Sequence, residues 1–318
     1  MTTAATDSLA TLFDEAVAEN AKPLWPVLGE LSPPEPVAKA VPHVWRYERI
    51  RPFCERAARL VGTEDAERRV FMLCNPGLEA PYATDTLYAG YQTILPGEVA
   101  RAHRHTPFAL RFIVEGANAF TAVEGEKVVM ERGDMVLTPA WEWHDHGNES
   151  DKPMIWLDGL DLPIWKTIPA NFTDHYPEPR YPSARREGPS IRRYPWAEIA
   201  QELARVEGPT AEARYKHREH GGEISATIGA SACRLDAGAR TAPLRETASA
   251  VYHVYEGAGR TVVDGTELTW KQGDSFVVPA WTTAVHENTT TQRAFLFRFD
   301  DRPLVKGIGA YRADHGKA

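Results

Sequence analysis

Three histidines, His103, His105 and His144, are the residues of this chain whose type and spacing point most directly to chemistry. Successive side chains of a β-strand point to opposite faces, so His103-Arg104-His105 places two imidazoles on the same face. Three neutral imidazoles that converge on one point can hold a divalent metal and leave other coordination positions open. We therefore predict that His103, His105 and His144 bind a metal ion.

The residues around these histidines are spaced as in a motif with regularly placed glycines. The two halves read Gly97-x5-His103-x-His105 and Gly133-x5-Pro139-x4-His144-x3-Asn148. They resemble the two parts of the cupin signature, which implies a β-barrel that brings distant histidines together. Many cupins have a glutamate ligand four or five residues after the second histidine, where this chain has Ala109 and Leu110. The expected ligand set is therefore three histidines without a carboxylate. By itself this set does not choose among Fe(II), Mn(II), Co(II), Ni(II), Cu(II) and Zn(II).

A second β-rich block repeats the first. Residues 116–125 correspond to 257–265 and residues 132–141 to 272–281, with the turn glycines and the Gly-Asp and Pro-Ala-Trp corners retained. We predict an all-β bicupin, made of two double-stranded β-helix (jelly-roll) barrels, with an N-terminal helical segment. The predicted divisions are residues 1–80 for the helical and extended segment, 81–166 for the metal-binding barrel, 167–220 for a linker and 221–318 for the second barrel. Helices are expected over Ser8–Glu19 and after Pro52.

The metal ligands are not repeated in the second block. Leu244, Glu246 and Ala284 stand where the first block has its three histidines. Leucine and alanine cannot bind a metal, so no metal is expected in the second barrel. His286 lies two residues past the expected third position, and together with Glu246 it leaves a degenerate site as the alternative.

Composition limits the classes of partner. The net charge of −8 disfavours nucleic acid and anionic membranes. No secretory signal and no apolar run of transmembrane length is found. The three scattered cysteines are typical of reduced thiols in a cytoplasmic protein. The arginine-rich residues 185–193 favour a solvated linker or subunit contact over an anion site.

Several longer motifs resemble the gentisate 1,2-dioxygenase family, which includes salicylate, 5-nitrosalicylate and 1-hydroxy-2-naphthoate 1,2-dioxygenases. The most specific are Trp143-His-Asp-His-Gly-Asn148 and Leu157-Asp-Gly-Leu-Asp161, supported by Ala21-Lys-Pro-Leu-Trp25, Trp45-Arg-Tyr47, Asn75-Pro-Gly77 and His103-Arg-His-Thr-Pro107. The resemblance implies a non-haem Fe(II) enzyme that uses O2 to cleave an aromatic ring between its carboxyl-bearing and hydroxyl-bearing carbons. It further implies that the first barrel is the active one and that the protein is a homo-oligomer, commonly a tetramer.

Residues beside the metal are candidates for substrate binding and proton transfer. Arg111 shares the inward face of its strand with the histidines by parity, and its guanidinium is suited to a carboxylate. The alternative is an ion pair within the barrel. His146, two residues after His144, is a candidate acid or base. Asp158 is expected either to orient His146 or Arg111, or to be a turn residue before Gly159.

The same resemblance places further residues near the substrate. Gln92 precedes the metal-binding strand, and Tyr88 and Gly90 share its parity. Either Arg68 or Arg69 is expected to provide a second contact to the substrate carboxylate, and parity does not decide between them.

The preferred function is the conversion of gentisate to maleylpyruvate. Salicylate, 5-nitrosalicylate and 1-hydroxy-2-naphthoate are alternative substrates. The expected partners are therefore a small aromatic acid and O2. More distant alternatives are a metal-binding cupin sensor or storage-like protein, and a Mn or Ni cupin enzyme that is not an oxygenase.

Overall fold

The computed structural model describes residues 8–62 and 66–315, and the chain divides into two units, residues 1–37 and 38–318. The first unit contains helices α1 (Leu9–Ala18) and α2 (Leu28–Leu31). The Ser8 hydroxyl caps α1 by accepting a hydrogen bond of 3.1 Å from the Thr11 amide. The expected helix over Ser8–Glu19 is confirmed, and no side chain of α1 is buried.

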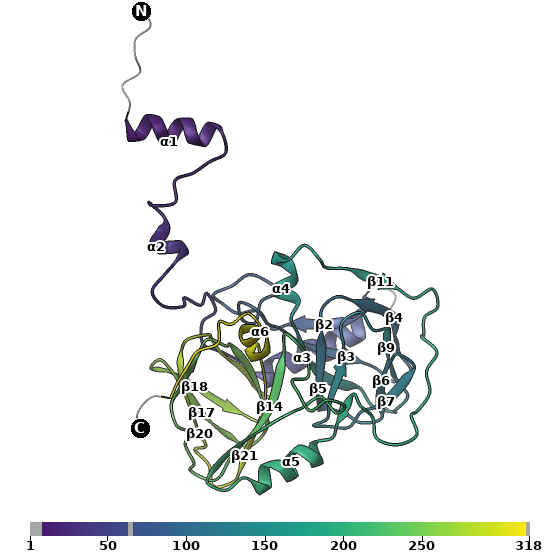
Figure 1. Ribbon diagram of the computed structural model, residues 1–318. Helices are drawn as coiled ribbons and strands as arrows, with labels where there is room; N and C mark the ends of the chain where they lie inside the picture. Colours follow the sequence, from purple (N-terminus) through teal and green to yellow (C-terminus); the bar gives the residue numbers. More distant parts are fainter. Residues whose placement is uncertain (1–7, 63–65, 316–318) are drawn as a thin grey trace, which may run out of the picture. The chain divides into compact units, whose positions relative to one another are not determined.

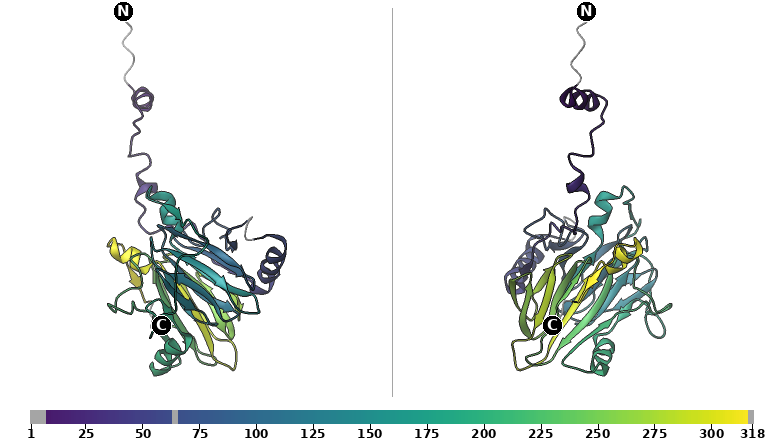
Figure 2. Two further views of the ribbon diagram at one scale, coloured as in Figure 1. Left: turned by 90° about the vertical axis from the view of Figure 1, so that its right-hand side faces the viewer. Right: turned by 60° about the vertical axis from the view of Figure 1, so that its left-hand side comes forward.

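The second unit consists of two β-barrels, seen side by side in Figure 1 and from two further directions in Figure 2. The first barrel has a six-stranded sheet in the order β12-β8-β5-β10-β3-β2 and a five-stranded sheet in the order β11-β4-β9-β6-β7. Its main strands are β3 (Tyr88–Ile94), β4 (Val99–His105), β5 (Ala109–Glu115), β6 (Ala119–Val123), β7 (Glu126–Val129), β8 (Met135–Thr138), β9 (His144–Asn148) and β10 (Met154–Leu160).

The second barrel repeats this arrangement. Its sheets run β1-β19-β16-β21-β14-β13 and β18-β17-β20-β15-β22. Its main strands are β14 (Gly229–Leu235), β15 (Leu244–Glu246), β16 (Ala250–Glu256), β17 (Ala258–Val263), β18 (Thr266–Lys271), β19 (Ser275–Val278), β20 (Thr283–Glu287) and β21 (Ala294–Asp300). The predicted all-β architecture of two barrels is confirmed.

The segments outside the repeated blocks supply edge strands to both barrels. Strand β1 (His43–Trp45) precedes the first barrel but pairs with β19 of the second, and β12 (Arg193–Tyr194) precedes the second barrel but pairs with β8 of the first. The other added strands are β2 (Arg69–Met72), β11 (Thr173–His175), β13 (Thr210–Arg214) and β22 (Ala313–Asp314). This exchange of edge strands ties the two barrels together.

Helix α3 (Tyr47–Leu60) contains Pro52. The expectation that this helix starts after Pro52 was therefore wrong, since it begins at Tyr47. Pro52 lies in the second turn, where its missing amide removes one hydrogen bond without ending the helix. The remaining helices are α4 (Leu162–Thr167), α5 (Trp196–Arg205) and α6 (Arg302–Gly307). Within residues 8–62 and 66–315, no helix has both the length and the apolar character needed to cross a bilayer.

The two six-stranded sheets share an apolar core. Phe112 of β5 stacks on Phe297 of β21 at 4.1 Å between ring centroids. Polar contacts at the end of each barrel reinforce this interface: Asp161 accepts a hydrogen bond of 2.6 Å from Thr227, and Asp301 accepts one from Thr86. Both aspartates immediately precede a short helix, so each barrel contributes one equivalent aspartate to a hydrogen bond with the other barrel.

Candidate metal centre and adjoining pocket

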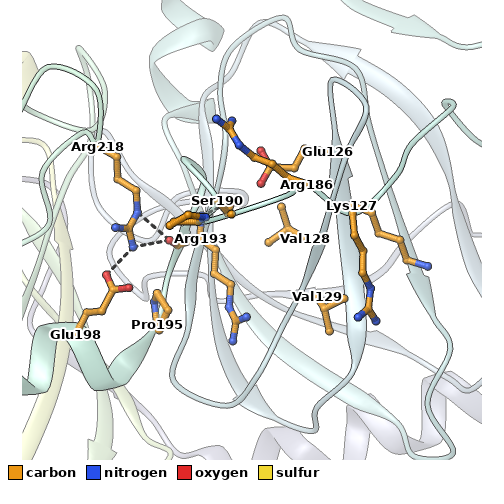
Figure 3. A pocket seen from close by; sticks show the side chains of 13 residues that line it. Glu126, Lys127, Val128, Val129, Arg186, Ser190, Arg193, Pro195, Glu198 and Arg218 are labelled. Carbon is orange, nitrogen blue, oxygen red and sulfur yellow. Dashed lines mark hydrogen bonds and ion pairs between the residues drawn. The ribbon is translucent and has the colours of Figure 1, made fainter.

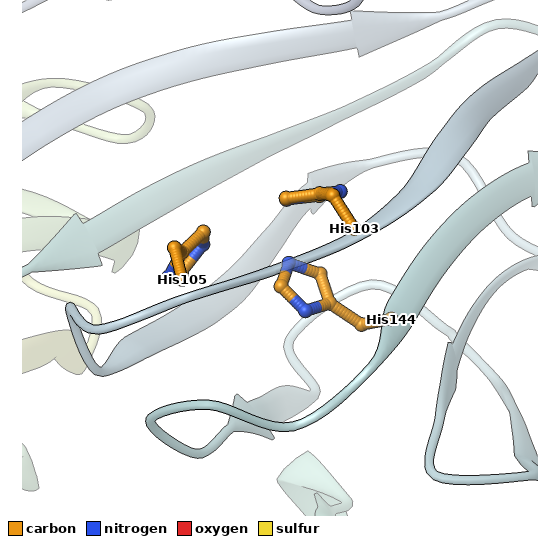
Figure 4. A group of neighbouring side chains, drawn as sticks. All are labelled: His103, His105 and His144. Atoms are coloured by element: carbon orange, nitrogen blue, oxygen red, sulfur yellow. The ribbon is translucent and has the colours of Figure 1, made fainter. Parts of the chain in front are cut away.

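The three predicted ligands converge in the first barrel. His103 and His105 lie on β4 and His144 on β9, and His103 and His144 are directly paired in the antiparallel ladder. Figure 4 shows the three rings turned toward a common point. One ligand nitrogen from each ring lies within 4.8 Å of the other two. Among the described residues, this is the one group of three or more such side chains with metal-binding geometry.

Backbone carbonyls determine which ring nitrogen of each histidine carries the proton. The Nδ1 atoms of His103, His105 and His144 lie 3.0, 2.8 and 2.9 Å from the carbonyl oxygens of Arg101, Pro107 and Glu142. A carbonyl only accepts hydrogen bonds, so each Nδ1 must be the donor. The proton of each neutral ring is thus on Nδ1, which leaves the Nε2 lone pairs free to bind a metal.

Burial keeps these imidazoles neutral. It lowers the pKa of His103 to about 2, that of His105 to about 4 and that of His144 well below its ordinary value, with nearby positive charge adding to the effect. The Nε2 atom of His144 is buried and has no hydrogen-bond partner. An orphaned lone pair at the centre of three neutral imidazoles fits a divalent cation, because a metal would satisfy the atom that the protein leaves unpaired.

A pocket of about 280 Å³ opens beside His105. Of the predicted substrate-binding and catalytic residues, Arg68, Tyr88, Gln92, Arg111 and Asp158 line it. Val70, Met72, Leu160 and Leu162 form apolar walls, and Asn171 and Thr173 close one side. The pocket therefore combines apolar surface with two guanidinium groups, a composition suited to an aromatic acid.

Arg111 is held by two side chains on neighbouring strands. Its Nε lies 3.3 Å from Asp158 Oδ1, and its Nη1 donates to the Thr138 hydroxyl. Asp158 also accepts a hydrogen bond of 3.0 Å from the Trp156 indole. Asp158 thus lies within β10 and orients Arg111, which excludes the alternative of a turn aspartate. Burial raises the pKa of Asp158 to about 6, opposed by Arg111 and Arg68.

His146 lies behind the ligands on β9 and is completely buried. Its Nδ1 is 2.9 Å from the Thr121 hydroxyl, and its Nε2 has no hydrogen-bond partner. The ring of His146 is 5.8 Å from that of His144, so its free nitrogen is close to the metal ligands without joining their cluster.

The two candidate arginines, Arg68 directly before β2 and Arg69 at its first position, point in different directions. The Arg68 guanidinium contacts Nε2 of His103, the lone pair that a metal would require. The Arg69 guanidinium instead donates to the carbonyls of Ala58 and Val61 and pairs with Glu98. Arg69 was therefore wrongly included among the substrate-binding residues, because strand alternation turns it away from the pocket.

Tyr88, Gly90 and Gln92 occupy one face of β3, as their parity predicted. Gln92 is 2% exposed, and its amide has no hydrogen-bond partner among the residues that the structure describes. Gly90 is absent from the pocket lining, but its missing side chain matters: a Cβ there would lie 2.7 Å from the Tyr88 hydroxyl and from Cγ1 of Val70. Gly90 thus allows Tyr88 to lie flat along the strand.

Sequence reasoning missed Thr138 and the walls formed by Val70, Met72, Asn171 and Thr173. Thr138 carried a usable signal, since it lies directly before the Pro139 corner of the metal motif. Asn171 and Thr173 follow α4 and come back to the pocket through the pairing of β11 with β4. Nothing in their local sequence indicates this return.

The corresponding positions of the second barrel have a different chemistry. Leu244 and Ala284 are paired in the ladder as His103 and His144 are in the first barrel. Glu246 accepts hydrogen bonds from Arg298, Arg302 and Tyr311. Its carboxylate is thus saturated by protein donors.

Another depression lies between β7 and the basic connector, away from the histidines (Figure 3). Arg218 there binds Glu198 and the Arg193 carbonyl, Arg193 pairs with Asp134, and Lys127 pairs with Glu149. These three cations are neutralised by neighbouring carboxylates, whereas Arg185 and Arg186, which also line the depression, have no ion pair among the described residues.

Comparison with known proteins agrees with this geometry. A family model described as "Cupin domain" matches residues 90–160 and 232–298, one match in each barrel. The chain is 36% identical to gentisate 1,2-dioxygenase 1 of Aquipseudomonas alcaligenes, covering 97% of both proteins. It is 32% identical to 5-aminosalicylate 1,2-dioxygenase of Comamonas sp., covering 96% of this chain and 89% of the relative. The crystal structure of salicylate 1,2-dioxygenase from Pseudaminobacter salicylatoxidans superposes with a TM-score of 0.90 at 33% identity, covering 98% of this chain and 99% of the other.

Proposed function

Because the chain belongs to the gentisate 1,2-dioxygenase family of ring-cleaving cupin dioxygenases, we propose that it is a non-haem Fe(II) enzyme that opens an aromatic acid with O2. The substrate carries a hydroxyl ortho to its carboxyl group, and the ring breaks between the two carbons that bear them. Gentisate, giving maleylpyruvate, is the preferred substrate. The observation that carries this proposal is the convergence of the imidazoles of His103, His105 and His144 beside a pocket that contains Arg111.

His103, His105 and His144 hold the iron, which supplies the redox chemistry that lets O2 react with an aromatic ring. Arg111 binds the substrate carboxylate through the guanidinium edge that Asp158 and Thr138 leave free. Arg68 provides the second carboxylate contact, moving from the His103 nitrogen to the acid when metal and substrate are present. In this arrangement two cations fix the orientation of one carboxylate.

The remaining polar groups act on the hydroxyl side of the ring. His146 keeps Nδ1 bound to Thr121 and presents Nε2 as the atom that holds or accepts a proton. Gln92 offers its amide to a ring substituent. Tyr88 packs against the ring, in the space that Gly90 leaves open. The apolar walls exclude water from the reacting carbons.

Assembly and location belong to the same proposal. We expect a homo-oligomer, most simply a tetramer, as the family resemblance implies. The N-terminal unit supports assembly, because Leu9, Leu12, Leu24, Trp25 and Leu31 all have side chains that are at least 47% exposed. The three cysteines are all free thiols, which supports the expected cytoplasmic location.

The test is anaerobic reconstitution with Fe(II), followed by measurement of O2 uptake and ultraviolet absorbance. Gentisate, salicylate, 5-aminosalicylate, 5-nitrosalicylate and 1-hydroxy-2-naphthoate are compared side by side. We expect stoichiometric O2 consumption and a ring-opened product with gentisate. Turnover of another acid in preference to gentisate would change the substrate while keeping the reaction. An iron-loaded protein that consumes no O2 with any of them would contradict the proposal.

A further inference from the structure

The second barrel contains a cavity of about 270 Å³, nearly as large as the pocket beside the metal centre. Leu244, Glu246 and Ala284, which replace the three metal-binding histidines, all line it. The cavity therefore occupies the place of the metal centre in the duplicated barrel. The second barrel thus contains a cavity at this place although the side chains at the three ligand positions differ.

One polar pair of the first barrel is retained there. His286 Nδ1 lies 2.8 Å from the Thr261 hydroxyl, as His146 Nδ1 lies 2.9 Å from that of Thr121. The Trp270 indole donates to the same Thr261 oxygen at 2.9 Å. The Thr261 hydroxyl is therefore the donor to His286 Nδ1, which is its acceptor among the described residues. The proton of the neutral His286 ring is then on Nε2. His286 thus presents an N–H donor at the cavity wall.

In the second barrel, a different pair of residues stands where the first barrel has Arg111 and Asp158. Tyr252 and Arg298 are paired in register, as Arg111 and Asp158 are in the first barrel. The Tyr252 hydroxyl has no hydrogen-bond partner within the described part of the chain, and Tyr252 is 6% exposed. A group that could bind a carboxylate is thereby replaced by a neutral donor and acceptor.

Arg298 does not make the cavity cationic. Its guanidinium lies 2.7 Å from Glu246, 3.4 Å from Asp300 and 3.5 Å from Glu212. Arg302 and Arg214 balance the rest of these carboxylates, at 2.6 Å from Glu246 and 3.3 Å from Asp300 respectively. Arg214 also lies 3.0 Å from Glu223, which Lys306 approaches at 3.6 Å. Four cations thus face four carboxylates, so no net charge remains to attract an ion.

We propose that the cavity of the second barrel binds a small uncharged phenol without a metal. Its size suits one substituted ring, since cavities of about 150 Å³ already accept benzene. Alanine, leucine, valine and proline side chains form the apolar walls. The Nε2 proton of His286 and the hydroxyl of Tyr252 hydrogen-bond the ring substituents. This inference is independent of the proposed dioxygenase activity, because it uses no residue of the first barrel.

The experiment is calorimetric titration of the full-length, metal-free Arg111→Met variant with 4-hydroxybenzyl alcohol. The substitution is expected to weaken acid binding in the first pocket. We expect one site per chain with Kd below about 1 mM, a range that calorimetry resolves. The anionic analogue 4-hydroxybenzoate, which has the same ring, is expected to bind at least tenfold more weakly.

Two further substitutions locate the site, each made in the Arg111→Met background. His286→Phe keeps a ring but removes the donor, and Ala284→Leu fills the cavity; each is expected to weaken binding at least tenfold. Circular dichroism checks that both variants fold. If His286→Phe does not fold, the binding measured with Ala284→Leu decides the question. Absent binding, equal binding of the two probes, or binding unaffected by a folded cavity variant would overturn the proposal. If the iron-loaded wild-type enzyme consumes no O2, that result contradicts the proposed function and leaves this inference unaffected.

Discussion

The Nε atom of Arg111 and the Oδ1 atom of Asp158 lie 3.3 Å apart on paired strands of the first barrel, and both side chains are almost fully buried. The carboxylate therefore fixes one edge of the guanidinium and leaves another directed toward the pocket. An arginine held in this way is ready to bind an acid before the acid arrives, so little side-chain entropy is lost on binding.

Replacing Arg111 by methionine should weaken substrate binding. The variant keeps the volume of the side chain but loses the charge and the fork that faces a carboxylate. We expect KM for gentisate to rise by about 10- to 100-fold, the range for loss of a hydrogen bond to a charged group, with iron content unchanged. Steady-state O2 uptake and iron analysis check this. An unchanged KM would remove Arg111 from the carboxylate role.

Asp158→Asn should change how stability depends on pH. Burial raises the pKa of Asp158 to about 6, so between about 4 and 6 the folded state binds more protons than the unfolded state. Stability then falls as pH rises through this window, by about 3 kcal/mol in total at 1.36 kcal/mol per pKa unit. Asparagine cannot titrate, so the variant should lack this loss.

Urea unfolding of both metal-free proteins at several pH values between 4 and 7.5 measures this effect. The difference in unfolding free energy, wild type minus variant, should become more negative as pH rises. A difference that does not vary with pH would show that Asp158 has an ordinary pKa.

His103→Ala should abolish metal binding. Removing one of three imidazoles leaves two ligands and an empty position, a greater loss than the roughly 10- to 100-fold caused by changing outer partners of a metal ligand. Iron analysis after reconstitution and O2 uptake should both fall to background. His220→Ala is a suitable control, since His220 is exposed and lies outside the histidine cluster. Full iron content in His103→Ala would contradict the assigned ligands.

Gly90→Ala should narrow the pocket. The new methyl group would lie 2.7 Å from the Tyr88 hydroxyl, which is the free end of a side chain and is displaced more easily than backbone. We expect KM for the two-ring acid 1-hydroxy-2-naphthoate to rise about 10-fold more than KM for gentisate, since small changes in pocket volume discriminate by roughly this factor.

Gly307→Ala is the matched control for that substitution, because nothing lies within 4 Å of the position that its methyl group would take and its φ angle is ordinary. It should leave both KM values unchanged. Equal changes for the two acids in Gly90→Ala would mean that Tyr88 does not border the ring.

The sequence by itself predicted the repeated barrels, the clustering of His103, His105 and His144, and the replacement of these histidines in the second barrel. These features depend on local spacing: turn glycines and prolines set each hairpin, and strand alternation places His103 and His105 on one face. Arg111, His146 and Gln92 followed from the same parity and from family motifs. Their positions could therefore be predicted from the sequence, although their roles remain proposals.

Only the tertiary structure decided which residues meet across long separations. It directed Arg68 toward His103 and Arg69 toward Glu98, paired Asp158 with Arg111, and returned Asn171 and Thr173 to the pocket. It also paired β1 with the second barrel and β12 with the first, and it formed a cavity beside Tyr252 and His286. Such contacts form when sheets pack and loops close. These steps bring together residues that are far apart in the chain, and the local sequence around one residue does not predict its distant partner.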